Sequence, residues 1–227
     1  MALRAPVRLY QDRGHVLTSA PSVEPVTADE LREKLRETSS QLGDTEANEL
    51  IATAREYAEK QTGLALITQS WRMAIDRWPS AREPWWDGVR DGSITELYGP
   101  QSASDLHFPR YPLQSVDNVT VYDEDTNSPA VTIANVFDVD TYSEPGRMTL
   151  KRGATWPVAL RANNAIEIVY TAGYGDAATD VPAPLKRAVK TTAAYMYANR
   201  GDGCGCDVAA IESGAQAILN GYKVARL

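Results

Sequence analysis

The spacing of hydrophobic residues divides the chain into a helical start, a β-rich middle and a helical end. Over residues 44–63 apolar side chains recur every three or four positions, the period of an amphipathic helix, and Gly63 is suited to end that helix. A shorter helix is expected from Thr27 to about residue 36, because Thr27 and Glu30 form a capping box before its apolar stripe. Two further helices are expected at about 182–199 and 208–219.

Between residues 64 and 174 the hydrophobic period changes to two, which is typical of strands with one exposed face. The alternating segments lie at 70–76, 118–122, 136–140 and 165–170, with a short edge strand expected at 15–18. Turn-forming residues cluster at 123–129, 144–147 and 173–175. The strands are therefore expected to be antiparallel.

This order of elements predicts an α+β fold. A small helical bundle, built from the N-terminal helix pair and the C-terminal helices, is interrupted by an antiparallel β-rich insertion. The expected divisions are an extended N-terminal arm at 1–26, a helical domain at 27–63 and 182–220, the β-rich insertion at 64–181 and a C-terminal tail at 221–227.

The charge balance argues against one class of function. The 227 residues include 23 Lys and Arg against 30 Asp and Glu, which gives a formal net charge of −7. Nonspecific nucleic-acid binders rely on neutralising phosphates with Lys and Arg, so this chain is not expected to be one. Its first residues lack the continuous apolar run of a signal peptide or a membrane span, and no membrane partner is expected.

The two cysteines are candidate metal ligands. Cys204 and Cys206 are separated only by Gly205, which disfavours a mutual disulfide and fits a reducing, cytosolic origin. A closed zinc site needs four ligands, but there is no second cysteine pair, and His15 and His107 lie far away in sequence. We expect no metal and no cofactor.

Two aspartates, at 138 and 140, are candidate catalytic groups. Asp138 and Asp140 share a strand face, which could suit calcium binding or acid–base chemistry, but exposed strand faces are commonly charged. The sequence holds no Gly-x-Ser-x-Gly nucleophile motif, and Gly173-Tyr174-Gly175 lacks the Lys-Ser or Lys-Thr of a phosphate loop. The chain is therefore not expected to be an enzyme.

Two further groups of residues are candidates for contacts. Trp85 and Trp86 lie in a long irregular stretch and could pack in a subunit contact or stack on a sugar. Lys186, Arg187 and Lys190 form a basic cluster on the third helix, which could face solvent, a neighbouring subunit's acids or DNA.

An ordered set of segments carries a resemblance to a known family. These segments are Ala52–Gly63 followed by Ala65–Trp71, then Phe108–Val116, Tyr170–Gly175, Val181–Lys186 and a tail ending in Arg226-Leu227. In this order they resemble the phage head–tail connector, or adaptor, proteins that carry a β insertion. The resemblance spans roughly residues 24–227.

The resemblance implies a structural adaptor, present as a ring of about twelve copies, that joins the portal of a tailed phage or a phage-like gene transfer agent to the tail. The helical domain would form the ring wall. Expected partners are further copies of the chain, the portal protein and a tail-side stopper or terminator protein. DNA would pass through the lumen without sequence-specific binding.

The family also implies a location and a docking segment. The protein would be assembled in the bacterial cytoplasm and would lie in the neck of the virion or particle. The C-terminal tail is the candidate portal or subunit interface, with Tyr222, Lys223, Val224, Arg226 and Leu227 as its residues. The resemblance does not separate an infectious phage from a gene transfer agent.

Two other classes of function stay open beside the adaptor. The first is a carbohydrate-binding module on the particle surface that uses Trp85 and Trp86. The second is a hydrolase that uses Asp138 and Asp140. A ring or portal complex would favour the adaptor, whereas sugar binding by a monomer would favour the first alternative.

Overall fold

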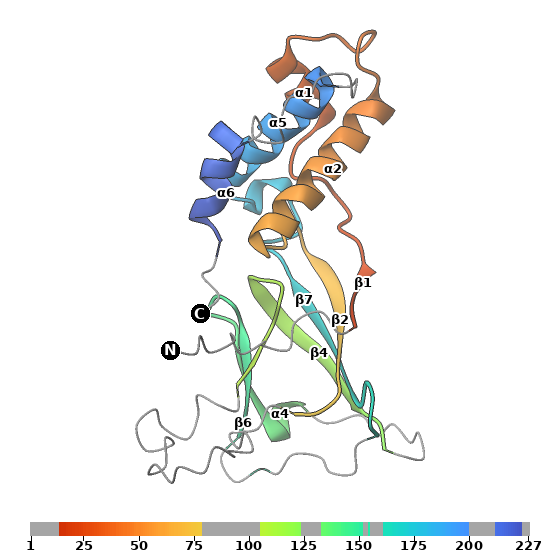
Figure 1. Ribbon diagram of the computed structural model, residues 1–227, viewed down its shortest axis with the longest axis vertical. Helices are drawn as coiled ribbons and strands as arrows, with labels where there is room; N and C mark the ends of the chain where they lie inside the picture. Colours follow the sequence, from red (N-terminus) through yellow and green to blue (C-terminus); the bar gives the residue numbers. More distant parts are fainter. Residues whose placement is uncertain are drawn as a thin grey trace, which may run out of the picture. The chain divides into compact units, whose positions relative to one another are not determined.

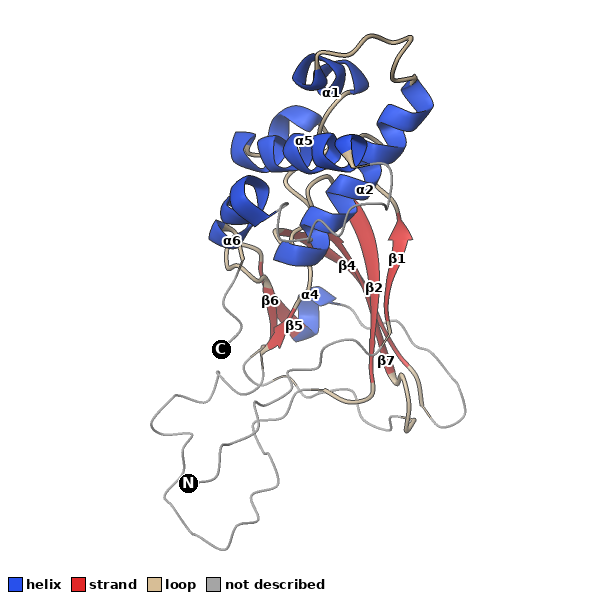
Figure 2. Ribbon diagram, turned by 45° about the horizontal axis from the view of Figure 1, so that its top comes forward, coloured by secondary structure: helices blue, strands red, loops and turns tan. Residues whose placement is uncertain are grey.

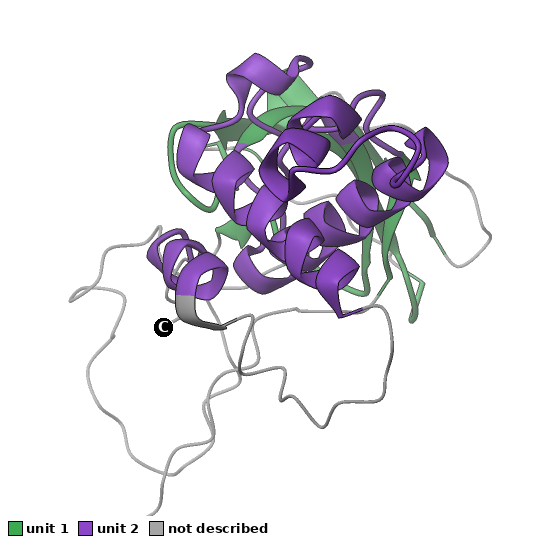
Figure 3. Cartoon of the chain, turned by 90° about the horizontal axis from the view of Figure 1, so that it is seen from above, with its two compact units in different colours: residues 1–19, 70–109, 113–171 green, residues 20–69, 110–112, 172–227 purple. Residues whose placement is uncertain are grey.

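The computed structural model of the chain describes residues 14–78, 105–123, 133–151, 154, 161–199 and 212–223. The chain forms two compact units, coloured separately in Figure 3. The β unit comprises residues 1–19, 70–109 and 113–171, and the helical unit comprises residues 20–69, 110–112 and 172–227. Each unit is assembled from segments that are far apart in the sequence.

The helical unit is built on α1 (Ala28–Leu35), α2 (Asp44–Thr62) and α5 (Ala183–Ala198). A short 3-10 turn at Ala178–Asp180 precedes α5, and a π-helical turn at Glu212–Gln216 leads into α6 (Ala217–Gly221). The helix α2 packs against both α1 and α5, and α6 contacts α2 and α5 (Figure 1). The core between them is apolar, with Leu31, Ile51, Ala54, Leu185, Val189 and Leu219 fully or almost fully buried.

The predicted start of the first helix and the predicted end of the second are confirmed, whereas the predicted start of the last helix at residue 208 lies outside the described residues. The Thr27 hydroxyl accepts a hydrogen bond from the Glu30 backbone N–H, and the Glu30 carboxylate accepts one from the Thr27 N–H, so the capping box is complete. The long helix α2 ends at Gly63, which has φ 84° and donates its N–H to the Glu59 carbonyl.

The β unit contains two sheets (Figure 2). The first has the order β1-β2-β7-β4, formed by His15–Ser19, Gln69–Ile75, Ile166–Ala172 and Leu113–Val121. The second has the order β3-β6-β5, formed by Leu106–His107, Arg147–Leu150 and Phe137–Asp140, with the one-turn helix α4 (Ile133–Val136) before β5. The β1/β2, β3/β6 and β5/β6 pairs are antiparallel.

Aromatic side chains occupy the core of the β unit. Tyr170 is fully buried in β7, and its ring packs against Phe108 with 4.8 Å between the ring centroids. A hydrogen bond of 2.6 Å joins the Tyr170 hydroxyl to His15 Nε2, and the His15 ring stacks on Trp71 at 4.3 Å. The expected edge strand at residues 15–18 is therefore present as β1, fixed to the sheet by its histidine.

The predicted α+β class is confirmed, and several predicted element boundaries are wrong. Val136 ends α4 instead of starting a strand, because the apolar run around it fits a helical turn as well as a strand. Arg147 begins β6 instead of closing a turn, since it pairs with His107 and Asp140 in register. The strand expected from residue 118 begins at Leu113.

Candidate interface site

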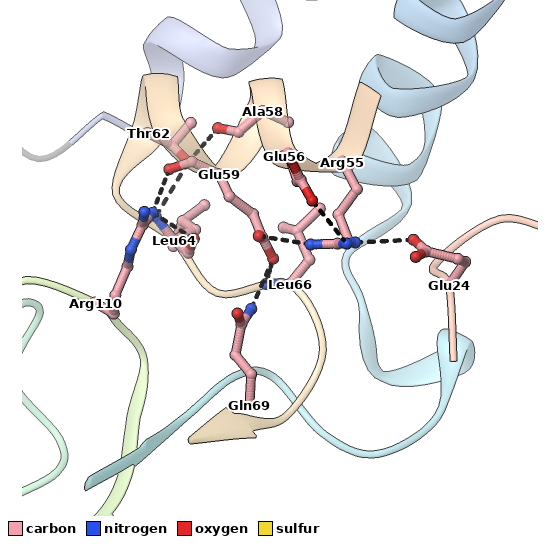
Figure 4. A network of polar contacts seen from close by, with 10 residues as sticks. All are labelled: Glu24, Arg55, Glu56, Ala58, Glu59, Thr62, Leu64, Leu66, Gln69 and Arg110. Carbon is pink, nitrogen blue, oxygen red and sulfur yellow. Dashed lines mark hydrogen bonds and ion pairs between the residues drawn. The ribbon is translucent and has the colours of Figure 1, made fainter. Parts of the chain in front are cut away.

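A buried ion network lies on one side of α2 (Figure 4). Arg55 Nη1 donates to Glu59 Oε2 at 3.0 Å, one helical turn away, and Arg55 Nε donates to Glu24 Oε2 at 2.9 Å. A weaker ion pair of 3.7 Å joins Arg55 to Glu56, which is largely exposed. Through Arg55 the segment that precedes α1 is therefore tied to α2.

The Glu59 carboxylate also fixes the loop that follows α2. Its Oε1 atom accepts hydrogen bonds from the Leu66 backbone N–H at 2.9 Å and from Gln69 Nε2 at 2.8 Å. The α2 terminus is held from a distant segment as well, because Arg110 Nη1 donates to the Glu59 carbonyl at 2.7 Å (Figure 4). The Glu59 carbonyl thus accepts from both the Gly63 N–H and Arg110, and a cation at this position interacts favourably with the negative end of the helix dipole.

The network acts as a scaffold for the helical unit. Burial raises the pKa of Glu24, an effect that the nearby Arg55 guanidinium opposes. Both Glu59 carboxylate oxygens accept hydrogen bonds, Oε2 from Arg55 and Oε1 from Leu66 and Gln69, so neither oxygen is left without a donor. Within the described residues no group of three or more His, Cys, Asp or Glu side chains could hold a metal ion.

The predicted basic cluster lines a groove between α1 and α5. The groove has a volume of about 630 Å³. Its lining includes the predicted residues Lys186, Arg187 and Lys190, together with Lys34 and Arg36 from the end of α1. Glu30 and Glu33 also line it, and Lys190 Nζ lies 3.8 Å from Glu30 Oε2. The structure thus brings the predicted cluster together with two cations that sequence reasoning did not connect to it.

Arg36 has an unusual backbone conformation for a side chain of its size. It follows α1 with φ 60° and ψ 36°, in the left-handed region, and its N–H donates to the Arg32 and Glu33 carbonyls. Glycine is the usual residue at such a helix end, because a Cβ there carries a steric cost. The Arg36 side chain is thus placed at the edge of the charged groove at a cost in backbone strain.

The predicted aspartate pair is on β5. The Asp140 carboxylate accepts hydrogen bonds from Ser143 Oγ at 2.6 Å, the Tyr142 N–H at 3.0 Å and Arg147 Nε at 3.0 Å, and these bonds lower its pKa to about 2. Asp138 is mostly exposed and lies 3.8 Å from Lys151 Nζ. A general acid needs a raised pKa, so the arrangement does not favour a hydrolase that protonates its substrate through Asp140.

The remaining predicted contact residues have different positions. Tyr222 is half-buried against the core of the helical unit, and Lys223 after it is exposed. The other residues lie outside the part of the chain that the structure describes: Trp85, Trp86, Cys204, Cys206, Val224, Arg226 and Leu227. Among the described residues no helix is both long and apolar enough to cross a membrane.

No protein-family model matches the chain, and no curated protein matches its sequence. Solved structures of gene transfer agent (GTA) particles do match. A chain in the neck of an empty GTA particle, solved with C6 symmetry, aligns with a TM-score of 0.70 and 21% identity over 95% of this chain and 97% of its own length.

Two further structures give the same result. A chain in the virion of a native GTA particle aligns with a TM-score of 0.68 and 21% identity, covering 94% of this chain and 96% of that one. A chain in the neck of a native GTA particle, solved with C12 symmetry, aligns with a TM-score of 0.61 and 20% identity over 93% and 97%. The protein therefore has the fold of these GTA particle chains along almost its whole length.

Proposed function

We propose that the protein is the head–tail adaptor subunit in the neck of a phage-like particle, a gene transfer agent or a tailed phage. The observation that supports this proposal most strongly is the fold match to chains of GTA necks, which covers 93–95% of this chain and 97% of those chains. A match of that extent includes both the helical unit and the β unit. The segments that resemble head–tail connectors lead independently to the same role.

The proposed adaptor works as a closed ring. The matching necks were solved with C6 and C12 symmetry, and both are compatible with a ring of twelve copies. One face of the ring would bind the portal, and the other would bind the stopper or terminator protein of the tail. The acidic character of the chain, with a net charge of −7, suits a lumen that DNA crosses without adhering.

The buried network supports a mechanical role. A ring subunit transmits load between head and tail, and the Arg55–Glu59 network ties α2, the segment before α1 and the loop after α2 into one body. The proposed site of action is the particle neck, after assembly in the bacterial cytoplasm. The chemistry is binding, with no reaction step.

Cryo-electron microscopy of intact particles tests the proposal. We expect density for this chain as a ring between the portal and the first tail ring. Deletion of the gene should leave filled heads that lack tails, and a plasmid copy should restore joined particles. Density on the outer fibres with none in the neck would overturn the proposal and favour the carbohydrate-binding alternative.

A further inference from the structure

We propose that the α1/α5 groove is one half of the contact between neighbouring copies, and that it receives Glu49 and Glu56 from α2 of the next copy. This inference rests on the proposed ring and specifies how its subunits meet. Three observations carry it: the charge of the groove, the position of the two glutamates on α2 and the requirement of cyclic symmetry for two different surfaces.

The groove carries an excess of positive charge in an acidic protein. Five cationic and two acidic side chains line it, and Lys190 is already paired with Glu30. No ion pair joins Lys34, Arg36, Lys186 or Arg187 to another residue in the part of the chain that the structure describes. Such a surface is complementary to carboxylates, which a second copy of this chain supplies in excess.

The matching carboxylates lie on the outer face of α2. Ala47, Ile51, Ala54 and Ala58 are buried along one face of this helix. At about 100° per residue, Glu49 and Glu56 are turned by nearly 180° from that face, and both are exposed. Glu56 remains 73% exposed despite its 3.7 Å ion pair with Arg55. The two glutamates are seven residues apart, or roughly 10 Å along the axis, so both lie on the same outer face of α2.

Cyclic symmetry needs a pair of surfaces of this kind. In a ring each subunit uses one surface toward the next copy and a different surface toward the previous one. Since α2 meets α1 and α5 with its buried face, its outer face and the groove are two distinct surfaces of the helical unit. Both surfaces belong to the helical unit, so this one unit would carry the whole contact.

A charge swap in particle-producing cells tests the contact. The first variant carries Lys186→Glu and Arg187→Glu, and the second carries Glu49→Lys and Glu56→Lys. Each is expected to lower the yield of tailed particles by roughly tenfold or more, because like charges then face one another. The four changes together should restore the yield. Arg77→Glu and Glu144→Lys reverse exposed charges in the β unit and should leave it unchanged.

The possible results separate this inference from the proposed function. Absence of the wild-type chain from the neck would refute the function and, with it, the inference. If the wild-type chain is in the neck but the two paired variants assemble normally, only the inference fails. It also fails if the four changes, in a chain that circular dichroism shows to be folded, give no rescue. Loss of packaged DNA in necks that still form would instead identify phosphate as the occupant.

Discussion

Arg55 and Glu59 form an ion pair in which both side chains are more than nine-tenths buried, one helical turn apart on α2. Removing one member of such a pair leaves a charge without its partner in a desolvated site, which costs far more than losing an exposed pair. Glu59 also accepts from Leu66 and Gln69, so its loss affects the loop as well as the helix.

Glu59→Gln is therefore expected to lower the free energy of unfolding by about 3 kcal/mol or more. The matched control is Glu56→Gln, the same substitution on the same helix at a side chain that is 73% exposed, and it should change stability by less than about 0.5 kcal/mol. Urea unfolding followed by circular dichroism at 222 nm measures both. Equal losses in the two variants would mean that the buried network stabilises the fold no more than an exposed ion pair does.

Gly173→Ala is expected to disrupt the start of the segment that leads back to the helices. A Cβ at Gly173 would lie 2.6 Å from the Thr68 backbone nitrogen and 2.7 Å from the Ile67 carbonyl, and the residue has φ 145°. We expect a loss of at least about 2 kcal/mol, since backbone atoms cannot move aside as a side chain can. Gly214→Ala, where a Cβ meets nothing within 4 Å, should be neutral or slightly stabilising. Thermal melts of the two variants decide the matter.

Asp140 gives the β unit a pH dependence with a definite sign. Its pKa is lowered from 3.8 to about 2, so the carboxylate stabilises the fold above pH 4, and this stabilisation is lost as the pH falls toward 2. Asp140→Asn should flatten the dependence of Tm on pH in that window. The measurement is a series of melts between pH 2 and pH 6. Identical slopes for the variant and the wild type would contradict the assignment.

Arg36→Gly should separate stability from assembly. A side chain in the left-handed region costs about 1–2 kcal/mol relative to glycine, so the variant is expected to be more stable by about 1 kcal/mol. If Arg36 contributes to the contact between copies, the same variant should yield fewer tailed particles. Arg36→Ala keeps the strain and removes the charge, and it should lose assembly without gaining stability. A more stable variant with a normal yield would show that the charge of Arg36 is dispensable.

Local signals explain the parts of the fold that could be predicted from the sequence. The capping box at Thr27, the stripe of α2 and the glycine at 63 each depend on residues within one or two turns. The aspartate pair and the basic cluster were found for the same reason, because each occupies one strand or one helix.

The features that the sequence does not predict depend on residues that are far apart in the chain. Arg55 and Glu59 have the spacing of an ordinary surface ion pair, and only Glu24 and Gln69 around them reveal that they are buried. Lys34 and Arg36 join the basic cluster because α1 packs beside α5, which no local pattern encodes. Arg110 lies in a loop, and its sequence context gives no sign that its side chain binds the end of α2.

The interleaving of the two units has a consequence for synthesis on the ribosome. The chain passes between the units five times, after residues 19, 69, 109, 112 and 171. The helix α2 ends at Thr62, but α5, which covers its apolar face, begins only at Ala183. At elongation rates of about 5–20 residues per second, α2 therefore remains without α5 for on the order of ten seconds. Chaperone binding to the emerging chain is therefore expected to concentrate on α2.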